Sequence, residues 1–255
     1  MSDTYLTQTP LLDFGAGVIP ALIVTKGWQR LDAFERIGAA YTFVRDQIAF
    51  GYNRDDNIPA SAVLGDGYGQ CNTKATLLMA LLRALGIPCR LHGFTIHKAL
   101  QRGVVPELVY GLVPDNVLHS WVEIYHDGRW INLEGFILDR PFLSALQEKF
   151  GGAGNDLCGF GAGTDCLNAP PVDWTGQDTY IQKTGINADL GLFDSPDDFY
   201  ALHRQGVGWF RRFLYRNAVR HWMNARVRRV RLGQIPDTAA VNAHAHGEQL
   251  NRLPG

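Results

Sequence analysis

The sequence predicts an α+β fold in which helices pack on an antiparallel sheet. Apolar residues recur at spacings of three and four over residues 28–50, which is typical of an amphipathic helix. A nearly uniform apolar run over 71–85 ends in Gly86-Ile87-Pro88, a strong stop signal for a helix. Strand-like runs around Asp127-Gly128 then predict a hairpin. Helices followed by a meander indicate α+β architecture instead of a βαβ series.

The composition is that of an ordinary globular protein, with 46% of the 255 residues hydrophobic and 19% charged. A chain of this length can bury a large core without disulfide or metal staples. The formal net charge of −1 argues against global attraction to nucleic acid or to an anionic membrane.

The cysteines and the N-terminal residues bear on the compartment. Four cysteines are too few for a disulfide scaffold in a chain of this length. Residues 1–14 lack the basic start and apolar run of a signal peptide, and the apolar stretch 16–24 is too short to span a bilayer. We therefore expect a cytoplasmic protein with reduced thiols, no cofactor, and no membrane or nucleic-acid partner.

The segments around the two helical patterns are expected to be irregular. Residues 1–27 have the character of an extended arm, and residues 51–70 are rich in Gly, Asn, Asp and Pro, which is typical of a loop. The helix over 71–85 carries few polar residues, so we expect it to be buried on most sides. After Pro88 the pattern changes to strands, and residues 97–118 form a long insertion with room for a short helix at its start.

The hairpin over residues 118–138 is the clearest strand signal in the chain. Asp127-Gly128 is typical of a two-residue type I′ turn, which fixes the residues that face each other. Alternation along the strands then places His119 and Glu134 on one face, as diagonal neighbours about 7–8 Å apart. A three-residue turn would abolish this pairing. The predicted cross-strand pairs are His126 with Arg129, Tyr125 with Trp130, Glu123 with Asn132, and Trp121 with Glu134.

The rest of the chain is predicted as loop followed by helices. Segment 151–163 is rich in glycine, and an irregular stretch continues to about residue 195. Ser195-Pro196-Asp197-Asp198 has the features of a helix start, so helices are expected over 196–206 and 207–232, followed by a polar tail over 233–255. We expect a catalytic core over 1–150 and an extension over 151–255 packed on it. Residues 141–232 could also cover the active-site cleft.

Cys71, at the start of a buried helix, is a candidate nucleophile. The helix dipole and free backbone N–H groups would stabilise its thiolate, and its own N–H could help to bind an oxyanion. Gly69 would let a substrate approach the thiol without obstruction. His119 could form the ion pair and protonate a leaving group, while Glu134 could hold the imidazole in the useful tautomer.

The segments G-x-G-Q-C, LLRALGIPCR, H-S-W-V-E-I-Y and W-I-N-L-E resemble the transglutaminase-like superfamily over about residues 35–140. The resemblance implies a papain-like α+β core with a Cys-His-Asp triad. It makes Cys71 the nucleophile, His119 the base and acid, and Glu134 the orienting acid. The family pattern usually has aspartate where this chain has Glu134, and Asp139 is the fallback if the glutamate points elsewhere.

Several other residues are candidates around this triad. Gln70 could shape the oxyanion site through its side chain, His97 could line the cleft, and Trp121 shares the face of His119. Cys89 is expected in the core. Cys158 and Cys166 lie in a predicted loop without histidines at metal spacing, so unrelated thiols or a structural pair are favoured over zinc or a disulfide.

The predicted function is cysteine-dependent hydrolysis or acyl transfer through a thioester, on a peptide, amide, ester or other acyl substrate. The family spans cross-linkers, peptidases, deamidases and amide synthases, so the resemblance does not fix the substrate. No dense run of acidic residues suggests the calcium sites of the animal cross-linking enzymes. The alternative is a non-catalytic binding module that retains the fold. The oligomeric state is left open.

The arginine-rich run over residues 211–232 permits two interpretations. It could form a surface for nucleic acid or an acidic partner. The near-neutral net charge favours an amphipathic helix whose apolar face docks on the core, with arginines solvated or paired with the acids of 194–199.

Overall fold

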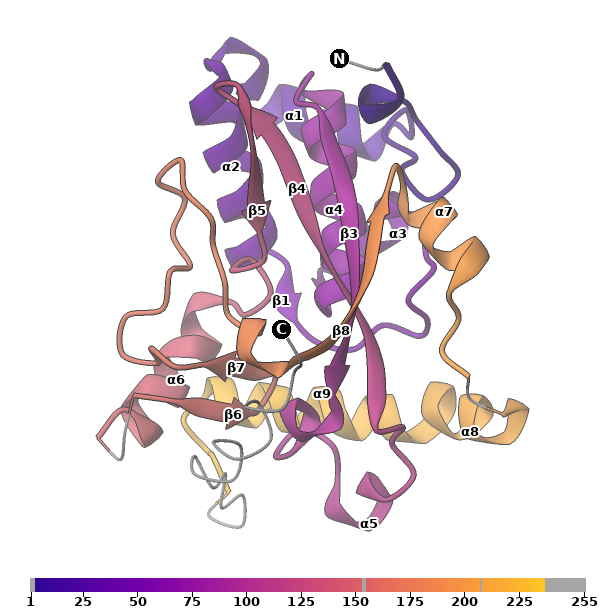
Figure 1. Ribbon diagram of the computed structural model, residues 1–255, viewed down its shortest axis with the longest axis vertical. Coiled ribbons are helices and arrows are strands. Elements are labelled where there is room, and N and C mark those ends of the chain that lie inside the picture. The colour runs from indigo at the N-terminus through magenta and orange to yellow at the C-terminus, as the bar shows by residue number, and fades with distance from the viewer. Residues whose placement is uncertain (1–2, 153–154, 207, 237–255) are drawn as a thin grey trace, which may run out of the picture.

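The computed structural model, which describes residues 3–152, 155–206 and 208–236, has the predicted α+β architecture (Figure 1). Its central sheet has the strand order β5-β4-β3-β8, and every neighbouring pair is antiparallel. The strands of this sheet are β3 (Cys89–His97), β4 (Asn116–His126), β5 (Arg129–Leu133) and β8 (Ile186–Phe193).

The N-terminal helices cover one face of the sheet, and α4 is the central one (Figure 1). Every residue of α4 from Cys71 to Arg83 is buried, because α2 and α3 pack on it from one side and β4 from the other. Side chains of Gln70 and Thr73 cap its first turn reciprocally. The N-terminal helices are α1 (Val18–Lys26), α2 (Ala33–Asp46), α3 (Ala60–Asp66) and α4 (Cys71–Ala84).

The hairpin has the predicted turn and register. Asp127 and Gly128 both have positive φ, 49° and 80°, as a type I′ turn requires. The strands pair His126 with Arg129, Tyr125 with Trp130, and Glu123 with Asn132. Glu134 follows the last residue of β5, so it lies at the open end of this strand.

Several elements were not expected from the sequence. Helices α1 and α3 lie in the predicted arm and loop, and α6 follows directly on the hairpin. The sequence predicts an irregular segment where strand β8 lies. This strand is at the edge of the sheet and all its residues are exposed or half-buried, so it lacks the apolar alternation of a buried strand. The remaining elements are α5 (Glu107–Tyr110), α6 (Arg140–Phe150), β1 (Ala49–Phe50), β2 (Tyr68–Gly69), β6 (Leu157–Gly159), β7 (Ala162–Thr164), and the short helices η1 (Asp3–Leu6), η2 (Trp28–Arg30), η3 (Lys98–Gln101) and η4 (Lys183–Gly185).

The last two α-helices, α8 and α9, cross the molecule below one end of the sheet, whereas α7 lies beside β8 (Figure 1). Ser195 caps α7 as predicted, through a hydrogen bond that its Oγ accepts from the Asp198 N–H at 3.2 Å. The expected helix over 207–232 is α8, a π-helical segment and α9 in succession. Their bounds are α7 (Pro196–Leu202), α8 (Trp209–Leu214), η5 (Tyr215–Val219) and α9 (Arg220–Arg231). Most of the predicted polar tail, residues 237–255, lies outside the described residues.

The arginine-rich run docks as an amphipathic helix only in part. Met223, Val227 and Val230 of α9 are buried, whereas Trp209 and Phe213 of α8 are 80% and 60% exposed. The arginines pair differently from the prediction: Arg216 pairs with Asp55, and Arg231 with Asp139. The acids of 194–199 are engaged elsewhere, for example Asp197 with the N-terminal arm.

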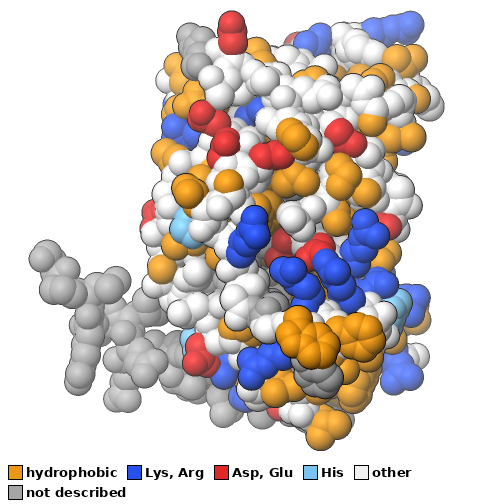
Figure 2. All heavy atoms as spheres, turned by 90° about the vertical axis from the view of Figure 1, so that its right-hand side faces the viewer, with side chains coloured by type: hydrophobic (Ala, Val, Ile, Leu, Met, Phe, Trp, Pro, Cys, Tyr) orange, Lys and Arg blue, Asp and Glu red, His pale blue; other side chains and the backbone are white. Residues whose placement is uncertain are grey.

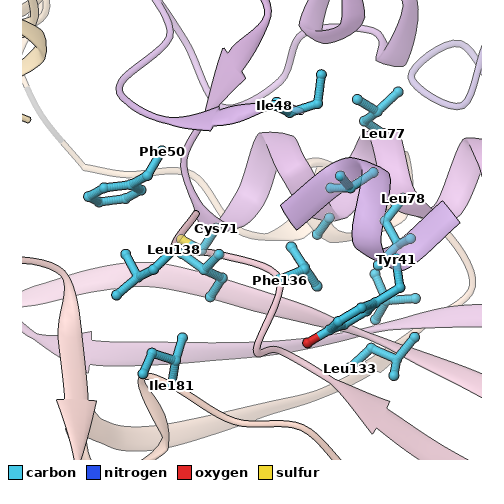
Figure 3. Close-up of a cluster of buried hydrophobic side chains, with 14 of the residues drawn as sticks. Tyr41, Ile48, Phe50, Cys71, Leu77, Leu78, Leu133, Phe136, Leu138 and Ile181 are labelled. Atoms are coloured by element: carbon cyan, nitrogen blue, oxygen red, sulfur yellow. The ribbon is translucent and has the colours of Figure 1, made fainter. Parts of the chain in front are cut away.

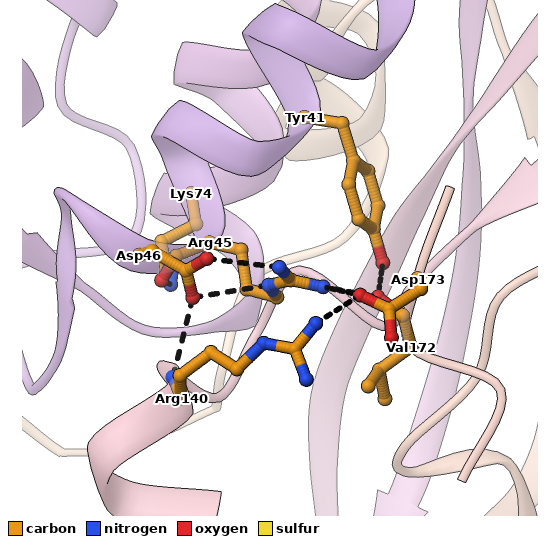
Figure 4. A network of polar contacts seen from close by, with 7 residues as sticks. All are labelled: Tyr41, Arg45, Asp46, Lys74, Arg140, Val172 and Asp173. Carbon is orange, nitrogen blue, oxygen red and sulfur yellow. Dashed lines mark hydrogen bonds and ion pairs between the residues drawn. The ribbon is translucent and has the colours of Figure 1, made fainter. Parts of the chain in front are cut away.

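A polar network ties α2 to α6 and to the segment at residues 172–173 (Figure 4). Arg45, buried at the end of α2, donates to Asp46 and to Asp173 at 2.8 Å each. Asp173 also accepts from Arg140 at the start of α6. Tyr41 donates to the Val172 carbonyl oxygen at 2.8 Å. These contacts hold the polypeptide around the hairpin's open end, where Glu134 lies.

Candidate active site

Cys71 is the first residue of α4, as the sequence predicts, and its residue is 9% exposed. It lies at the edge of a buried apolar cluster, with Phe50 and Leu138 close by (Figure 3). The backbone N–H groups of Asn72 and Ser120 lie close enough to its sulfur to stabilise the thiolate. Because Ser120 follows His119 on β4, this contact brings the start of the helix to the strand that carries the predicted base.

Asn72 holds the start of α4 against β4 on both sides of His119. Its Nδ2 donates to the Leu118 carbonyl oxygen at 3.2 Å, and its Oδ1 accepts from the Ser120 hydroxyl at 2.9 Å. The residue is only 2% exposed, so water does not compete for these bonds. Sequence reasoning missed Asn72, although its place directly after the candidate nucleophile was a usable signal.

His119 and Glu134 form a fully buried pair, as the hairpin register predicts. His119 Nε2 lies 3.3 Å from Glu134 Oε1, and neither side chain is exposed. The separation is that of an ion pair, but the direction does not meet hydrogen-bond geometry, and no described group bonds either ring nitrogen. Since Nε2 faces the carboxylate, Nδ1 is the nitrogen left for a thiol.

Backbone N–H groups fix the orientation of Glu134. Its carboxylate accepts from the N–H of Ile181, and from the N–H of Gln182 at 2.9 Å. Asp139, the fallback for this role, is engaged elsewhere: it caps α6 through the Phe142 N–H at 3.1 Å and pairs with Arg231. The geometry therefore selects Glu134 as the partner of His119.

Burial dominates the ionisation of the Cys71 thiol. Burial raises the pKa of the Cys71 thiol, and the nearby Asp56 carboxylate raises it further, whereas the N–H groups of Asn72 and Ser120 lower it. The N–H groups at the helix start therefore act in the expected direction, but the net shift of the pKa is upward. The reason is that desolvation of a buried thiolate outweighs the backbone N–H groups.

Asp56 is a site residue that sequence reasoning missed. Its Oδ1 accepts from Gln70 Nε2 at 2.7 Å, and its carboxylate also bonds the Asn72 side chain. Burial raises the pKa of Asp56, although these hydrogen bonds act in the opposite direction. Asp56 thus contacts both residues that flank Cys71. Nothing in its loop sequence distinguishes it from its acidic neighbour Asp55.

Gln70 and Gly69, the two residues before Cys71, make contacts within the protein. Gln70 lies beside the thiol, but its amide is occupied, since Oε1 accepts from the Asn53 N–H at 3.0 Å and Nε2 binds Asp56. A Cβ at Gly69 would lie 2.7 Å from Thr73 Oγ1 and 2.9 Å from Lys74 Cγ. Gly69 is therefore needed for packing under α4, and its role in substrate clearance stays a prediction.

His97 and Trp121 lie away from the thiol. His97 caps the short helix after β3, where its Nδ1 accepts from the Ala99 N–H at 3.2 Å, and it is not among the residues that line the cavity described below. Trp121 shares the face of His119, with ring centroids 6.2 Å apart, and donates to Asn132 Oδ1 at 2.9 Å. Both side chains therefore support the sheet around the site.

A cavity of about 250 Å³ opens beside Cys71. Its walls come from segments 50–56, 70–72, 105–118 and 211–223. Cys71 is the one member of the predicted triad on its wall, because His119 and Glu134 lie behind it. Part of the C-terminal extension therefore covers the approach to the thiol. The division into domains at residue 150 stays a prediction.

The other thiols take no part in this site. Cys89 is buried in the core, and Cys158 and Cys166 are half-buried on and after the β6–β7 hairpin, all with free thiols. In residues 3–152, 155–206 and 208–236 no cluster of three or more His, Cys, Asp or Glu could hold a metal ion. Within the same ranges no helix has the length and apolar character needed to cross a membrane.

A cysteine at the start of a buried helix, beside an antiparallel sheet that carries a His–Glu pair, defines the class of thiol enzymes with an α+β core. Residues 24–135, somewhat less than half of the chain, match the family model of the transglutaminase-like superfamily, which supports the resemblance seen in the sequence.

Individual relatives are more distant. The chain is 26% identical over 117 residues to "Uncharacterized protein YebA" of Bacillus subtilis (strain 168), a match that covers 44% of this chain and 16% of that protein. It therefore spans only a small part of that relative's length. A crystal structure of a "Putative Cysteine Protease" from Cytophaga hutchinsonii aligns with a TM-score of 0.41 and 13% identity, over 76% of this chain and 47% of that one.

Proposed function

We propose that the protein is a cysteine-dependent hydrolase or acyltransferase that works through a thioester on Cys71. One observation carries this proposal: α4 holds Cys71 against β4 next to His119, whose Nε2 lies 3.3 Å from Glu134. The buried carboxylate stabilises an imidazolium, which allows His119 to accept the thiol proton on Nδ1.

The steps follow from these roles. The Cys71 thiol transfers its proton to His119, and the thiolate sulfur attacks the carbonyl carbon of an amide, ester or thioester. The tetrahedral oxyanion collapses, the bond to the leaving group breaks, and His119 gives that group its proton. Water or an amine then attacks the thioester while His119 takes its proton, which releases the acid or the new amide and restores the thiol. Water gives hydrolysis and an amine gives acyl transfer.

The raised pKa of the thiol has a consequence for this chemistry. Because burial raises the pKa of the thiol, the proposal requires His119 to accept the thiol proton before the sulfur attacks. Two observations favour the alternative of a binding module in which Cys71 is a buried packing thiol. Burial raises the pKa of the thiol, and the ring nitrogens of His119 have no hydrogen-bond partner among the described residues. A labelling experiment separates the two.

The test is intact-protein mass spectrometry after incubation with 4-nitrophenyl acetate. The proposal expects one acetyl group per chain on Cys71, together with release of 4-nitrophenolate. Cys71→Ala should abolish both signals, whereas Cys158→Ala, which removes a half-buried thiol outside the site, should leave them unchanged. Equal acetylation of Cys71→Ala and the unaltered protein would overturn the proposal and leave the binding module.

A further inference from the structure

The cavity beside Cys71 is apolar along most of its length. Buried side chains on its wall include Phe50, Ile96, Leu118 and Met223, which come from four different elements or loops. Its volume of about 250 Å³ is slightly below the range of about 300–1,000 Å³ that is usual for drug-sized ligands. This space suits a short acyl chain or one apolar side chain, and it is too small for a folded peptide.

Three arginines line the same cavity at its solvent end. Arg54, Arg211 and Arg212 are exposed, whereas Cys71 lies at the buried end. Arg211 donates weakly to the Leu112 carbonyl oxygen at 3.4 Å. Among the ion pairs of the described residues, neither Arg54 nor Arg212 has a carboxylate partner. Their guanidinium groups are therefore available to a ligand.

The two acids on the cavity wall do not neutralise these arginines. Asp55 pairs with Arg216, and Asp56 hydrogen-bonds Gln70 at 2.7 Å. Figure 2 shows lysine and arginine side chains gathered around acidic ones on this side of the molecule, above large hydrophobic side chains. The solvent end of the cavity therefore carries net positive charge.

The cavity therefore has two chemically different ends, with the Cys71 sulfur at the buried end and the arginines at the solvent end. A substrate carbonyl must reach the sulfur at the buried end, so the group attached to it extends past the apolar wall and ends beside Arg54 and Arg212. We propose that the cavity is the acyl-donor subsite for a short aliphatic acyl group that ends in a carboxylate. Arginine suits such a terminus because its planar guanidinium binds a carboxylate through two parallel hydrogen bonds. This inference rests on the proposed function for the identity of the attacked carbonyl.

A binding experiment tests the subsite without catalysis. The probes are glutaric acid monoamide and pentanamide, which have the same chain length and differ in a terminal carboxylate or methyl group. We expect Cys71→Ala protein to bind the monoamide about fivefold more tightly, the upper range for an exposed ion pair, by ligand-observed NMR titration. Combining Cys71→Ala with Arg54→Ala and Arg212→Ala should remove the preference. Arg30→Ala, an exposed arginine outside the cavity lining, should retain it.

A kinetic arm separates this inference from the proposed function. Unaltered protein is acylated with the 4-nitrophenyl monoester of glutaric acid or with 4-nitrophenyl pentanoate. Faster acylation by the glutarate ester, lost in Arg54→Ala/Arg212→Ala, supports both proposals. Equal rates with both esters would overturn the subsite and leave the thiol chemistry intact. No acylation by either ester, with the arginine-dependent preference retained in binding, would overturn the chemistry and support the subsite. Equal binding of both amides, or the same loss in Arg30→Ala, would overturn the subsite.

Discussion

Glu134 is the residue on which the predicted triad depends most. It replaces the aspartate usual in the family, yet its longer side chain still brings Oε1 to 3.3 Å from His119 Nε2. It reaches this place because the N–H groups of Ile181 and Gln182 hold the carboxylate from behind. An aspartate at the same position would retreat by one methylene from the imidazole.

Glu134→Gln should lower kcat/KM for 4-nitrophenyl acetate by about 100-fold, because a neutral amide no longer stabilises the imidazolium. The glutamine oxygen can still accept one of the two backbone N–H groups, so the thermal midpoint should fall far less than in Glu134→Ala. Burst kinetics with 4-nitrophenolate release provide the measurement. A Glu134→Gln protein that acylates at the original rate would contradict the assigned role.

Asp56 acts on the thiol by charge. A carboxylate beside a thiolate disfavours it, so the Asp56 charge raises the pKa of Cys71 and its removal must lower that pKa. Asp56→Asn should therefore move the pH profile of Cys71 alkylation by iodoacetamide to lower pH, while the amide can keep a hydrogen bond to Gln70. Asp55→Asn is the matched control, since Asp55 is paired with Arg216. An unchanged or alkaline-shifted profile in Asp56→Asn would refute the coupling.

The triad could be predicted from the sequence, whereas Asn72 and Asp56 could not. Cys71 follows a glycine-rich loop at a helix start, and His119 and Glu134 lie on strands whose register a two-residue turn determines; these are local signals. Asn72 matters through its contacts with Leu118 and Ser120, 46 and 48 residues away. Contacts of that separation leave no periodic pattern in a single sequence.

At the scale of elements, the site is a junction between α4 and β4. The helix does not present a long polar face to the strand, because it is buried from Cys71 to Arg83. The polar link is concentrated in Asn72, which bonds the strand at two points. The placement of the helix start relative to His119 therefore depends largely on one amide side chain.

Asn72→Ala should destabilise the protein by about 1–3 kcal/mol, since it leaves a buried hydroxyl and a buried carbonyl without their partner. It should also lower the acylation rate of Cys71 by more than the loss of folded protein explains. Urea unfolding and burst kinetics on the same samples measure the two effects. Ser120→Ala removes one of the two bonds and should have a smaller effect on both. If Asn72→Ala acylates normally per folded molecule, Asn72 has only a structural role.

Two of the elements that the sequence does not predict lack a periodic pattern. Strand β8 is an edge strand with exposed side chains, and α1 contains Pro20 and is apolar almost all round, so neither displays the usual periodicity. Helix α6 did carry signals, an aspartate N-cap at Asp139 and Pro141 in its first turn.

At the scale of the whole molecule, the C-terminal helices are attached to the segment that borders the thiol. Asn224 of α9 bonds the Tyr52 N–H at 2.7 Å and its carbonyl oxygen at 3.0 Å, as a neighbouring strand would. Tyr215 donates to the Asn53 carbonyl oxygen at 3.0 Å. Because Asn53 also binds Gln70 beside Cys71, displacement of α9 would disturb the contacts at the start of α4, the helix that carries Cys71.

The Asp139 carboxylate connects three elements around the site: the start of α6, strand β1 and the end of α9. It accepts from the Phe142 N–H at 3.1 Å, the Phe50 N–H at 2.7 Å and Arg231 Nε at 2.9 Å. Burial alone would raise the pKa of Asp139, but Arg231 and the Phe50 N–H outweigh it and hold the pKa below its usual value.

The sign of the pH dependence follows from that shift. The unfolded chain has an aspartate pKa of about 3.9, so between this value and the lower folded pKa the unfolded state binds more protons. The contribution of Asp139 is therefore fully present above about pH 5 and is lost as the pH falls through the folded pKa.

Asp139→Asn, which keeps a good N-cap, should lower the unfolding free energy at pH 7 and flatten its decline below pH 4, as measured by urea titrations across pH. Arg231→Met should give a similar profile, and the double variant should be less destabilised than the sum of the two. If the single variants retain the full acid slope, the ion pair does not hold the C-terminal helix on the core, and the coupling of α9 to the thiol must run through Asn224 and Tyr215 alone.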